Sequence, residues 1–432
     1  MRGMFYVLLL ALAVCVIPFA LAQQKAAKLR HRVERIDEKG HAFPTNIIVV
    51  TNTDDSGPGS LRDALAIAND GDTIDATGVS GTIFLTSGEL QITHNLTING
   101  PGAGSLAVNG NGTSRVFDNI VRNVTISGLS ITNGSVTNGG GGGIFNNGGN
   151  SATLALNNCT VTGNDAEFGG GIVNMNGTLM VSNCTISNNG GIFGGGGISN
   201  SAFDGIATLI ITNSTISGNS AGDYGGGIAN VAAGSVTATA SVTVSNSTLS
   251  GNSVLGEGGA IANRAPDVGN FATLMITNST ISNNSATADG GGINNEDGAE
   301  LELGGTILKE GTSGENIFNA GTATSLGYNL SSDDGGGVLT GLGDQINTDP
   351  MLGSLGNNGG PTFTHALLPG SPAINAGDPT FTPPPFFDQR GPGFDRVING
   401  FIDKGSFEVQ GGGMPSLRPT PTPRPRPTHA PR

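Results

Sequence analysis

The amino-acid sequence predicts an all-β fold, a parallel β-solenoid of about ten rungs that begins with a short cap helix. Two short phrases recur through the middle of the chain, and their apolar residues alternate with small polar ones, which is typical of short strands. The composition agrees with this fold. Glycine accounts for 73 of the 432 residues and charged residues for 12%, against about 7% and 25% in average proteins.

Composition also excludes several classes of protein. The low charge argues against an ordinary disordered chain, which is usually rich in charged residues. The glycines lack the three-residue period of collagen. A net charge of −14 disfavours nucleic acid as a partner, because its binders place basic patches against phosphate.

Residues 1–22 are predicted to be a secretory signal peptide. Arg2 supplies the positive end, an apolar stretch follows, and Ala20-Leu21-Ala22 offers a small-residue cleavage site. An uncleaved anchor is the alternative, and lipidation at Cys15 is disfavoured because Val14 is too large for that pattern. No later segment approaches the roughly 18 apolar residues that span a bilayer. We therefore expect export and no transmembrane segment after cleavage.

The chain after the signal peptide begins with a charged leader, residues 23–45, and a β-helix is expected over 46–318. Its first element is a cap helix in Gly59 to Ile74, GSLRDALAIANDGDTI. Ser60 can cap this helix, with Asp63 three residues on as an approximate capping box. The helix presents an apolar face to the first rung. That face consists of Leu61, Ala64, Leu65 and Ala68.

Two phrases then alternate through the β-helix. The phrase Gly-Gly-(Gly/Ala)-Ile ends at Ile144, Ile172, Ile198, Ile228, Ile261 and Ile293. The phrase Asn-x-Thr-(Ile/Val/Leu)-(Ser/Thr) starts at Asn123, Asn158, Asn183, Asn213, Asn246 and Asn278. A fixed phrase with a variable gap indicates one repeated unit with loops of different length.

Within one copy, TLMVSNCTISNN, the alternation of Leu179 and Val181 slips by one residue after Asn183. Such a slip predicts a bend between two short strands, and GGGISN supplies a third strand. Three short strands per copy form one rung, and stacked rungs lie about 4.8 Å apart. Every position therefore faces its own copy, so inward charges are disfavoured and apolar columns are expected.

Two polar columns are also predicted. An amide ladder is expected at a bend. Its members are Asn188, Asn219, Asn252 and Asn284. Cys159 and Cys184 share a column with later serines and are expected to be small buried core residues, or else to form a disulfide. Those serines are Ser214, Ser247 and Ser279.

The repeat loosens after about residue 319, and residues 319–410 are expected to hold the last rungs and a C-terminal capping region. Residues 411–432 form a tail rich in proline and arginine. Proline favours an extended polyproline II conformation there. The tail either binds acidic envelope polymer or is only a spacer or a truncated anchor region.

Several of these stretches resemble secreted bacterial β-helix proteins of the pectate-lyase-like superfamily. Thr51 to Ile74 is similar to their N-terminal block, and the two recurring phrases resemble the repeats of polymorphic outer membrane proteins. Asn347 to Asp378, followed by DQRG, resembles the choice-of-anchor Q terminal region. The resemblance covers about Ile47 to Val409 and implies a right-handed, single-stranded parallel β-helix, export and a surface or extracellular location. It implies no single established activity.

The chain departs from this family in DKGSFE, where relatives more often have an apolar residue at Lys404 and alanine at Ser406. These two changes put only the local packing in doubt. The family also leads us to expect a sorting signal or membrane anchor near the end of the chain, and none is visible in the sequence.

The sequence offers little for catalysis. A polysaccharide lyase needs a base beside a Ca²⁺ site, and a glycoside hydrolase needs paired carboxylates. Residues 123–308 contain no histidine, no lysine and a single arginine, Arg264, which is predicted to be a solvated loop residue. Asp165, Asp223 and Asp289 either form a weak Ca²⁺ ladder or only aid solubility. We therefore assign no catalytic, cofactor-binding or metal-binding residue.

Binding is the alternative to catalysis. Phe168, Phe193 and Tyr224 precede successive glycine phrases and are the predicted ligand-binding residues, unless they only shield turn backbones. The sequence thus favours an exported, non-catalytic, monomeric scaffold for adhesion or carbohydrate binding, with a surface glycan or protein as partner. A lyase or glycoside hydrolase and a rigid envelope spacer are the alternatives.

Overall fold

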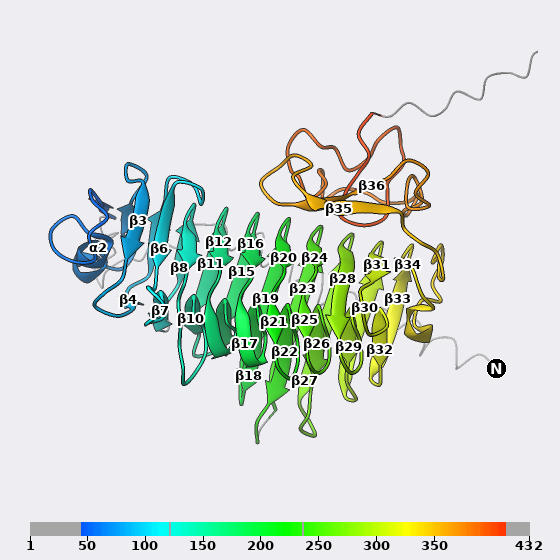
Figure 1. Cartoon of the computed structure of the whole chain (residues 1–432), viewed down its shortest axis with the longest axis horizontal. Coiled ribbons are helices and arrows are strands. Elements are labelled where there is room, and N and C mark those ends of the chain that lie inside the picture. The colour runs from blue at the N-terminus through cyan, green and yellow to red at the C-terminus, as the bar shows by residue number, and fades with distance from the viewer. Residues whose placement is uncertain (1–44, 121, 236, 412–432) are drawn as a thin grey trace, which may run out of the picture. The chain divides into compact units, whose positions relative to one another are not determined.

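The structure is a computed structural model that describes residues 45–411 except 121 and 236. By its contacts the chain divides into two units, residues 1–46 and 47–432. The predicted signal peptide, nearly all of the leader and nearly all of the tail lie outside the described residues. The second unit confirms the predicted fold class, because it is a right-handed, single-stranded parallel β-helix (Figure 1). None of its described helices is long and apolar enough to cross a membrane.

Each rung passes through three parallel sheets in turn. The first sheet holds β1 (Ile47–Val49), β2 (Thr73–Asp75), β5 (Leu96–Asn99), β8 (Val124–Ser127), β11 (Thr153–Asn157), β15 (Thr178–Ser182), β19 (Ile206–Thr212), β23 (Thr239–Ser245), β27 (Phe271–Thr277), β30 (Ala299–Gly304) and β33 (Thr322–Gly327).

The second sheet follows it. It holds β3 (Gly81–Phe84), β6 (Leu106–Asn109), β9 (Ser130–Thr132), β12 (Thr160–Thr162), β16 (Thr185–Ser187), β20 (Thr215–Ser217), β24 (Thr248–Ser250), β28 (Thr280–Ala286), β31 (Ile307–Glu310) and β34 (Leu330–Ser331). Through β28 it continues around a corner into β13 (Asp165–Phe168), β17 (Gly190–Gly194), β21 (Ser220–Ala221) and β25 (Ser253–Val254).

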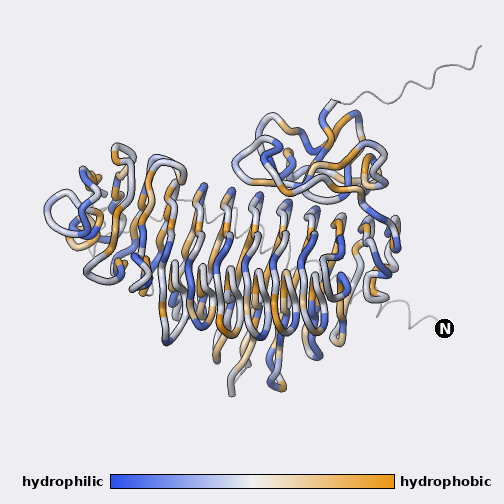
Figure 2. Tube along the Cα trace, viewed as in Figure 1, coloured by the Kyte–Doolittle hydropathy of each residue, from blue (hydrophilic) through white to orange (hydrophobic). Residues whose placement is uncertain are grey.

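The third sheet completes the rung. It holds β4 (Leu90–Ile92), β7 (Phe117–Ile120), β10 (Ile144–Asn147), β14 (Ile172–Met175), β18 (Ile198–Phe203), β22 (Ile228–Ala233), β26 (Ile261–Arg264), β29 (Ile293–Asn295) and β32 (Ile317–Asn319). The isoleucines that end the glycine phrases pair in one unbroken register from Ile144 to Ile293 and continue to Ile317. They are fully buried, and Figure 2 shows apolar residues recurring along the stacked rungs.

Glycine is required where the chain turns from the corner into the third sheet. A Cβ at Gly196 would lie 2.2 Å from the carbonyl oxygen of Ser220 on the next rung. A Cβ at Gly226 would lie 2.3 Å from the carbonyl oxygen of Ser253 in the same way. The glycine phrase therefore recurs because neighbouring turns approach too closely for any side chain.

The bend between the first and second sheets lies where the slip in alternation predicted it. Asn158, Asn183 and Asn213 adopt positive φ values of 52°, 52° and 51° there. The next residue begins a buried column in which the backbone N–H of Cys159 donates to the Sγ of Cys184 (3.3 Å), and that of Cys184 to the Oγ of Ser214 (3.1 Å). Both cysteines are buried free thiols, so they serve as core residues and form no disulfide.

The predicted amide ladder is confirmed except at one position. Asn189, not Asn188, donates from its side chain to Asn219 (2.9 Å), and the ladder continues to Asn252 and Asn284. Asn188 is exposed with φ of 55°, because the bend needs one residue of left-handed conformation before the ladder. Gly163 and Gly218 take that place in neighbouring rungs.

A second, longer amide ladder lies inside the third sheet and was not predicted. Its side-chain bonds, all between 2.7 and 2.8 Å, join consecutive rungs along the sheet. The members are Asn119, Asn146, Asn174, Asn200, Asn230, Asn263, Asn295 and Asn319. In six copies the asparagine follows the glycine-phrase isoleucine by two residues, so the signal was present in the sequence.

Helix α2 (Leu61–Ile67) covers the first rung as predicted. The Oγ of Ser60 accepts from the backbone N–H of Asp63 (3.1 Å). The apolar face of the helix is buried. Its side chains, with the residue that follows the helix, are Leu61, Ala64, Leu65 and Ala68.

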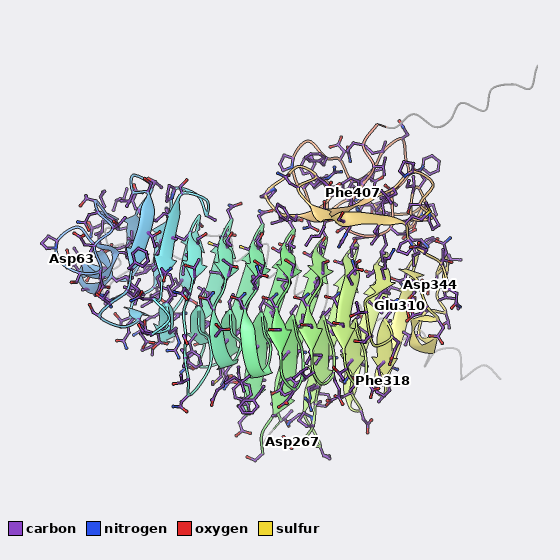
Figure 3. All side chains as sticks on the ribbon, viewed as in Figure 1. Asp63, Asp267, Glu310, Phe318, Asp344 and Phe407 are labelled. Atoms are coloured by element: carbon purple, nitrogen blue, oxygen red, sulfur yellow. The ribbon has the colours of Figure 1, made fainter. Side chains whose placement is uncertain are left out.

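The C-terminal region has two parts. Residues 332–349, including the short helix η1 (Gly335–Gly337), adjoin the last rung, where Gln345 bridges Leu330. Residues 350–411, called the C-terminal cap below, contain the antiparallel pair β35 (Leu352–Gly356) and β36 (Thr364–Leu367). The cap lies against the outer face of the second sheet, where Leu367 and Phe407 pack on Ile307 (Figure 3).

The two departures from the family pattern in DKGSFE are accommodated in this cap. The ammonium of buried Lys404 donates to the carbonyl oxygens of Asn329 (3.0 Å) and Gly343 (2.7 Å) and to Gln345 (2.8 Å). Burial lowers the pKa of Lys404 to about 8. Ser406 bonds to the hydroxyl of Thr280. Lys404 therefore links the cap to the last rung.

Candidate functional site

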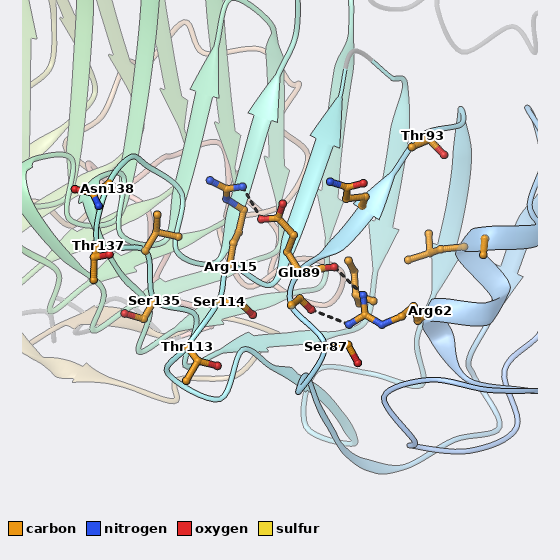
Figure 4. Close-up of a pocket in the computed structure, with 16 residues that line it drawn as sticks. Arg62, Ser87, Glu89, Thr93, Thr113, Ser114, Arg115, Ser135, Thr137 and Asn138 are labelled. Carbon is orange, nitrogen blue, oxygen red and sulfur yellow. Dashed lines mark hydrogen bonds and ion pairs between the residues drawn. The ribbon is translucent and has the colours of Figure 1, made fainter.

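A groove runs along the connections from the second sheet to the third, beginning beside α2. It consists of two adjoining hollows of about 870 Å³ and about 300 Å³, which share residues 135–137. The larger hollow is drawn in Figure 4. Because the loops that line it come from successive rungs, the groove follows the direction in which the rungs stack.

Two arginines stand at the α2 end of the groove, and both are held in place. Arg62 of α2 donates to the carbonyl oxygens of Gly88 (2.7 Å) and Glu89 (2.8 Å) and pairs with Asp55 (2.7 Å). Arg115 pairs with the carboxylate of Glu89 at 2.7 Å and also donates to two carbonyl oxygens of the next loop. These side chains brace the loops against one another.

A second carboxylate lies close to this arginine. Asp118 of β7 lies 4.0 Å from Arg115. Burial raises the pKa of Asp118, and the positive charge of Arg115 only partly offsets that effect. Glu89, Arg115 and Asp118 thus form one compact cluster at the groove, in which each charge has an opposite charge nearby.

The remaining side chains along the groove are mostly uncharged and polar. They include Gln91, Thr93, Thr113, Ser114, Ser135, Thr137 and Asn138. The Oγ of Ser114 is buried yet has no hydrogen-bond partner among the described residues. Hydroxyls and amides of this kind suit a ligand that offers hydroxyl groups of its own.

Two of the three predicted ligand-binding residues form an exposed aromatic pair beside the smaller hollow. The rings of Phe168 and Phe193 have centroids 5.1 Å apart with an interplanar angle of 31°. Phe168 is 36% exposed and Phe193 39%, and Ile192, which lines the smaller hollow, precedes Phe193 in β17. The pair therefore presents an exposed apolar surface on the strands next to the smaller hollow.

Tyr224 stands in a different column from Phe193. It pairs with Gly194 and with Glu257, because an irregularity in β13 and β17 shifts the register by one residue. Its ring carries the guanidinium of Arg264, 4.2 Å from the centroid. The sequence had predicted one strip of three rings, whereas the structure shows a pair of phenylalanines and a separate tyrosine.

Arg264 is not the solvated loop residue that the sequence predicted. It lies in β26, stacks on Tyr224 and pairs with Glu296 at 2.7 Å. Burial raises the pKa of both Tyr224 and Glu296. The prediction considered only the residues at the equivalent position of neighbouring rungs. Glu296 does not occupy that position, because it lies in the turn that follows β29 of the next rung.

The three aspartates considered for calcium lie in separate columns. Asp165 pairs with Gly190, Asp223 donates its N–H to Phe193, and the carbonyl of Asp289 accepts from Gly258. Within residues 45–411, apart from 121 and 236, no three His, Cys, Asp or Glu side chains are grouped to hold a metal ion. No catalytic residue is assigned.

Sequence reasoning missed the ionisable residues at the α2 end of the groove. Arg62, Glu89, Arg115 and Asp118 lie in three successive turns whose sequences share no phrase. The histidines lie elsewhere. His94 is half-buried and its ring bonds to the hydroxyl of Thr93, and buried His365 bonds to Ser250 and Gly353 within the cap contact.

The chain is thus a parallel β-helix with an open lateral groove. No family model matches it, and no curated protein matches it significantly. Among solved structures it is similar to the pectate lyase Pel9A, with 16% identity and a TM-score of 0.39, over 85% of this chain and 97% of that one. The fold assignment rests on the strand ladders, and this likeness adds nothing about activity.

Proposed function

We propose that this protein is an exported surface scaffold that binds a neutral carbohydrate chain along the groove without turning it over. One observation carries the proposal. Uncharged hydroxyl and amide side chains line the groove, and the exposed Phe168–Phe193 pair lies on the strands that border its smaller hollow. Polar edges and an apolar flat surface together match a sugar chain, whose rings have hydroxyl rims and apolar faces.

The charge of the chain favours a neutral glycan over an acidic one. The net charge is −14, and Glu89, Asp118 and Asp165 lie in or beside the groove. Arg62 and Arg115 are already committed to carboxylates and carbonyl oxygens. An acidic polymer would meet repulsion that these arginines do not offset.

Export and a location at the cell surface belong to this proposal. They are supported by the signal peptide expected in residues 1–22. Stacked rungs also suit such a location, because they give a stiff body whose loops can differ in length without disturbing the core.

Calorimetric titration tests the binding role. Purified protein is titrated with cello-, xylo-, manno- and maltohexaose and with a uronate hexamer. We expect a neutral hexaose to bind and Phe193→Ala to weaken it at least tenfold. Phe271→Ala is the matched control, because Phe271 is also an exposed phenylalanine, 54% accessible, on a different edge. Absence of binding would favour the rigid spacer, and binding of the uronate alone would contradict the neutral-ligand proposal.

Catalysis is a second candidate, favoured by one observation. The raised pKa of Asp118 beside Glu89 resembles the paired carboxylates of glycoside hydrolases, in which one acid stays protonated. The same hexaoses incubated with the protein and examined by chromatography test this candidate. We expect no new products. Turnover that Asp118→Asn abolishes while binding persists would replace the scaffold by a hydrolase.

A further inference from the structure

The C-terminal cap covers only part of the outer face of the second sheet. One outward column of that sheet runs in register through Ser130, Thr160, Thr185, Thr215, Thr248 and Thr280. The last three hydroxyl residues are buried under the cap. The first three are half-buried and lie beyond its edge.

The cap binds this column entirely through uncharged groups. The amide of Gln389 donates to the hydroxyl of Thr215 (3.0 Å) and accepts from that of Thr248 (2.6 Å). Thr215 also donates to the carbonyl oxygen of Phe363 (2.6 Å). The contact extends to the bend, where Asn246 donates to the carbonyl oxygen of Phe387 (3.2 Å). The interface shows which chemistry satisfies the column, namely hydroxyl, amide and carbonyl groups without charge.

The same chemistry continues on the uncovered rungs. A second outward column there contains Thr132, Thr162 and Ser187, and Ser187 donates to Thr162 at 3.2 Å. We call the uncovered face the hydroxyl ledge. It consists of Ser130, Thr132, Thr160, Thr162, Thr185 and Ser187. It carries no charged side chain, and Phe363, 51% exposed, stands where the cap borders it.

We propose that the hydroxyl ledge is a second binding site, distinct from the groove, for a stretch of about three sugars of a neutral glycan. The ledge spans three strands, β9, β12 and β16, each of which presents the same pair of hydroxyl residues. Rungs repeat about every 4.8 Å, close to the advance of one sugar in an extended chain. Each sugar can therefore meet an equivalent pair of hydroxyls, with the Phe363 ring at the cap border.

A glycan fits this face better than a polypeptide does. An added strand needs a free sheet edge, and the strands of the ledge are paired with neighbours on both sides. Side-chain hydroxyls are what remains available, and they can both donate and accept. The uncharged surface also gives no preference to ionic ligands.

The test separates the ledge from the groove. The four neutral hexaoses are titrated into Phe193→Ala protein, in which the groove is weakened, and amide hydrogen exchange is followed at residues 185–187. We expect saturable binding with protection of those amides, and at least tenfold weaker binding after Thr185→Glu or Phe363→Ala is added. Thr125→Glu, at a half-buried outward position of the first sheet, is the control and is expected to leave binding unchanged.

Three results would overturn the proposal. They are no protection of residues 185–187 by any hexaose, protection that Thr185→Glu leaves intact, and protection by a Gln/Ser-rich peptide instead of a glycan. Weaker hexaose binding by Phe193→Ala with unchanged protection of residues 185–187 reports on the groove alone. Failure of one site is therefore distinguishable from failure of the other.

Discussion

The amide ladder at the corner makes a sharp prediction about two adjacent asparagines. Asn189→Ala removes the side-chain oxygen of Asn189. That oxygen accepts two hydrogen bonds of 3.0 Å from Asn164, one from its backbone N–H and one from its side-chain amide. The donor to the carbonyl oxygen of Val161 (3.0 Å) is lost as well. Two buried backbone groups lose a partner, and at roughly 1–3 kcal/mol each the free energy of unfolding should fall by about 3 kcal/mol.

The adjacent residue supplies the control. Asn188 is exposed with φ of 55°, and Gly163 and Gly218 hold the equivalent place with φ of 66° and 64°. Asn188→Gly should therefore change the free energy of unfolding by no more than about 0.5 kcal/mol. Urea unfolding followed by far-UV circular dichroism measures both variants. Equal effects of the two substitutions, or a loss below about 1 kcal/mol for Asn189→Ala, would refute the ladder reasoning.

Three further outcomes follow from the same contacts. Gly196→Ala should prevent accumulation of folded protein, because the new Cβ would meet a carbonyl oxygen 2.2 Å away, whereas Gly78→Ala, with open space around it, should express normally. Cys184→Ser should shift the melting temperature little, because serines fill that column on later rungs, and a large loss would contradict the shared role. Burial, helped by Asp403, raises the pKa of Glu408 from 4.5 to about 8. The folded state then holds more protons than the unfolded state between those values, so stability should fall as pH rises from 4.5 to 8, and Glu408→Gln should make that slope markedly shallower in pH-dependent melts.

The fold was predictable because the same sequence pattern recurs in each rung. Each rung must satisfy the same close approach at Gly196 and its copies and the same apolar column at Ile198 and its copies, so one local rule is stated six times. The error at Asn188 has a physical cause. Both asparagines of that pair are compatible with the bend, and only the backbone conformation decides which of them enters the ladder.

The groove was not predictable to the same degree. Arg62, Glu89 and Arg115 come together through turns of unequal length, and no periodic rule states where such turns meet. Phe168 and Phe193 were identified because the glycine phrases that follow them set a common reference. Phe193 was assigned to the column of Phe168 and Tyr224, but the irregularity in β13 and β17 places Gly194 there instead. The difference in spacing was visible, because Phe193 stands five residues before Ile198, whereas Phe168 and Tyr224 each stand four residues before their isoleucine.

Because the columns continue from rung to rung, neighbouring rungs present equivalent contacts, and one rung can replace another. Removing residues 185–214, one full turn, would bring Asn164 beneath Asn219 and Cys184 beneath Ser247. Hydrogen-bonding partners of the same kind would then stand on either side of the join. Such a deletion shortens the body by about 4.8 Å while the two ends stay unaltered. The length of the β-helix can thus change in steps of one rung while the interior keeps the same columns.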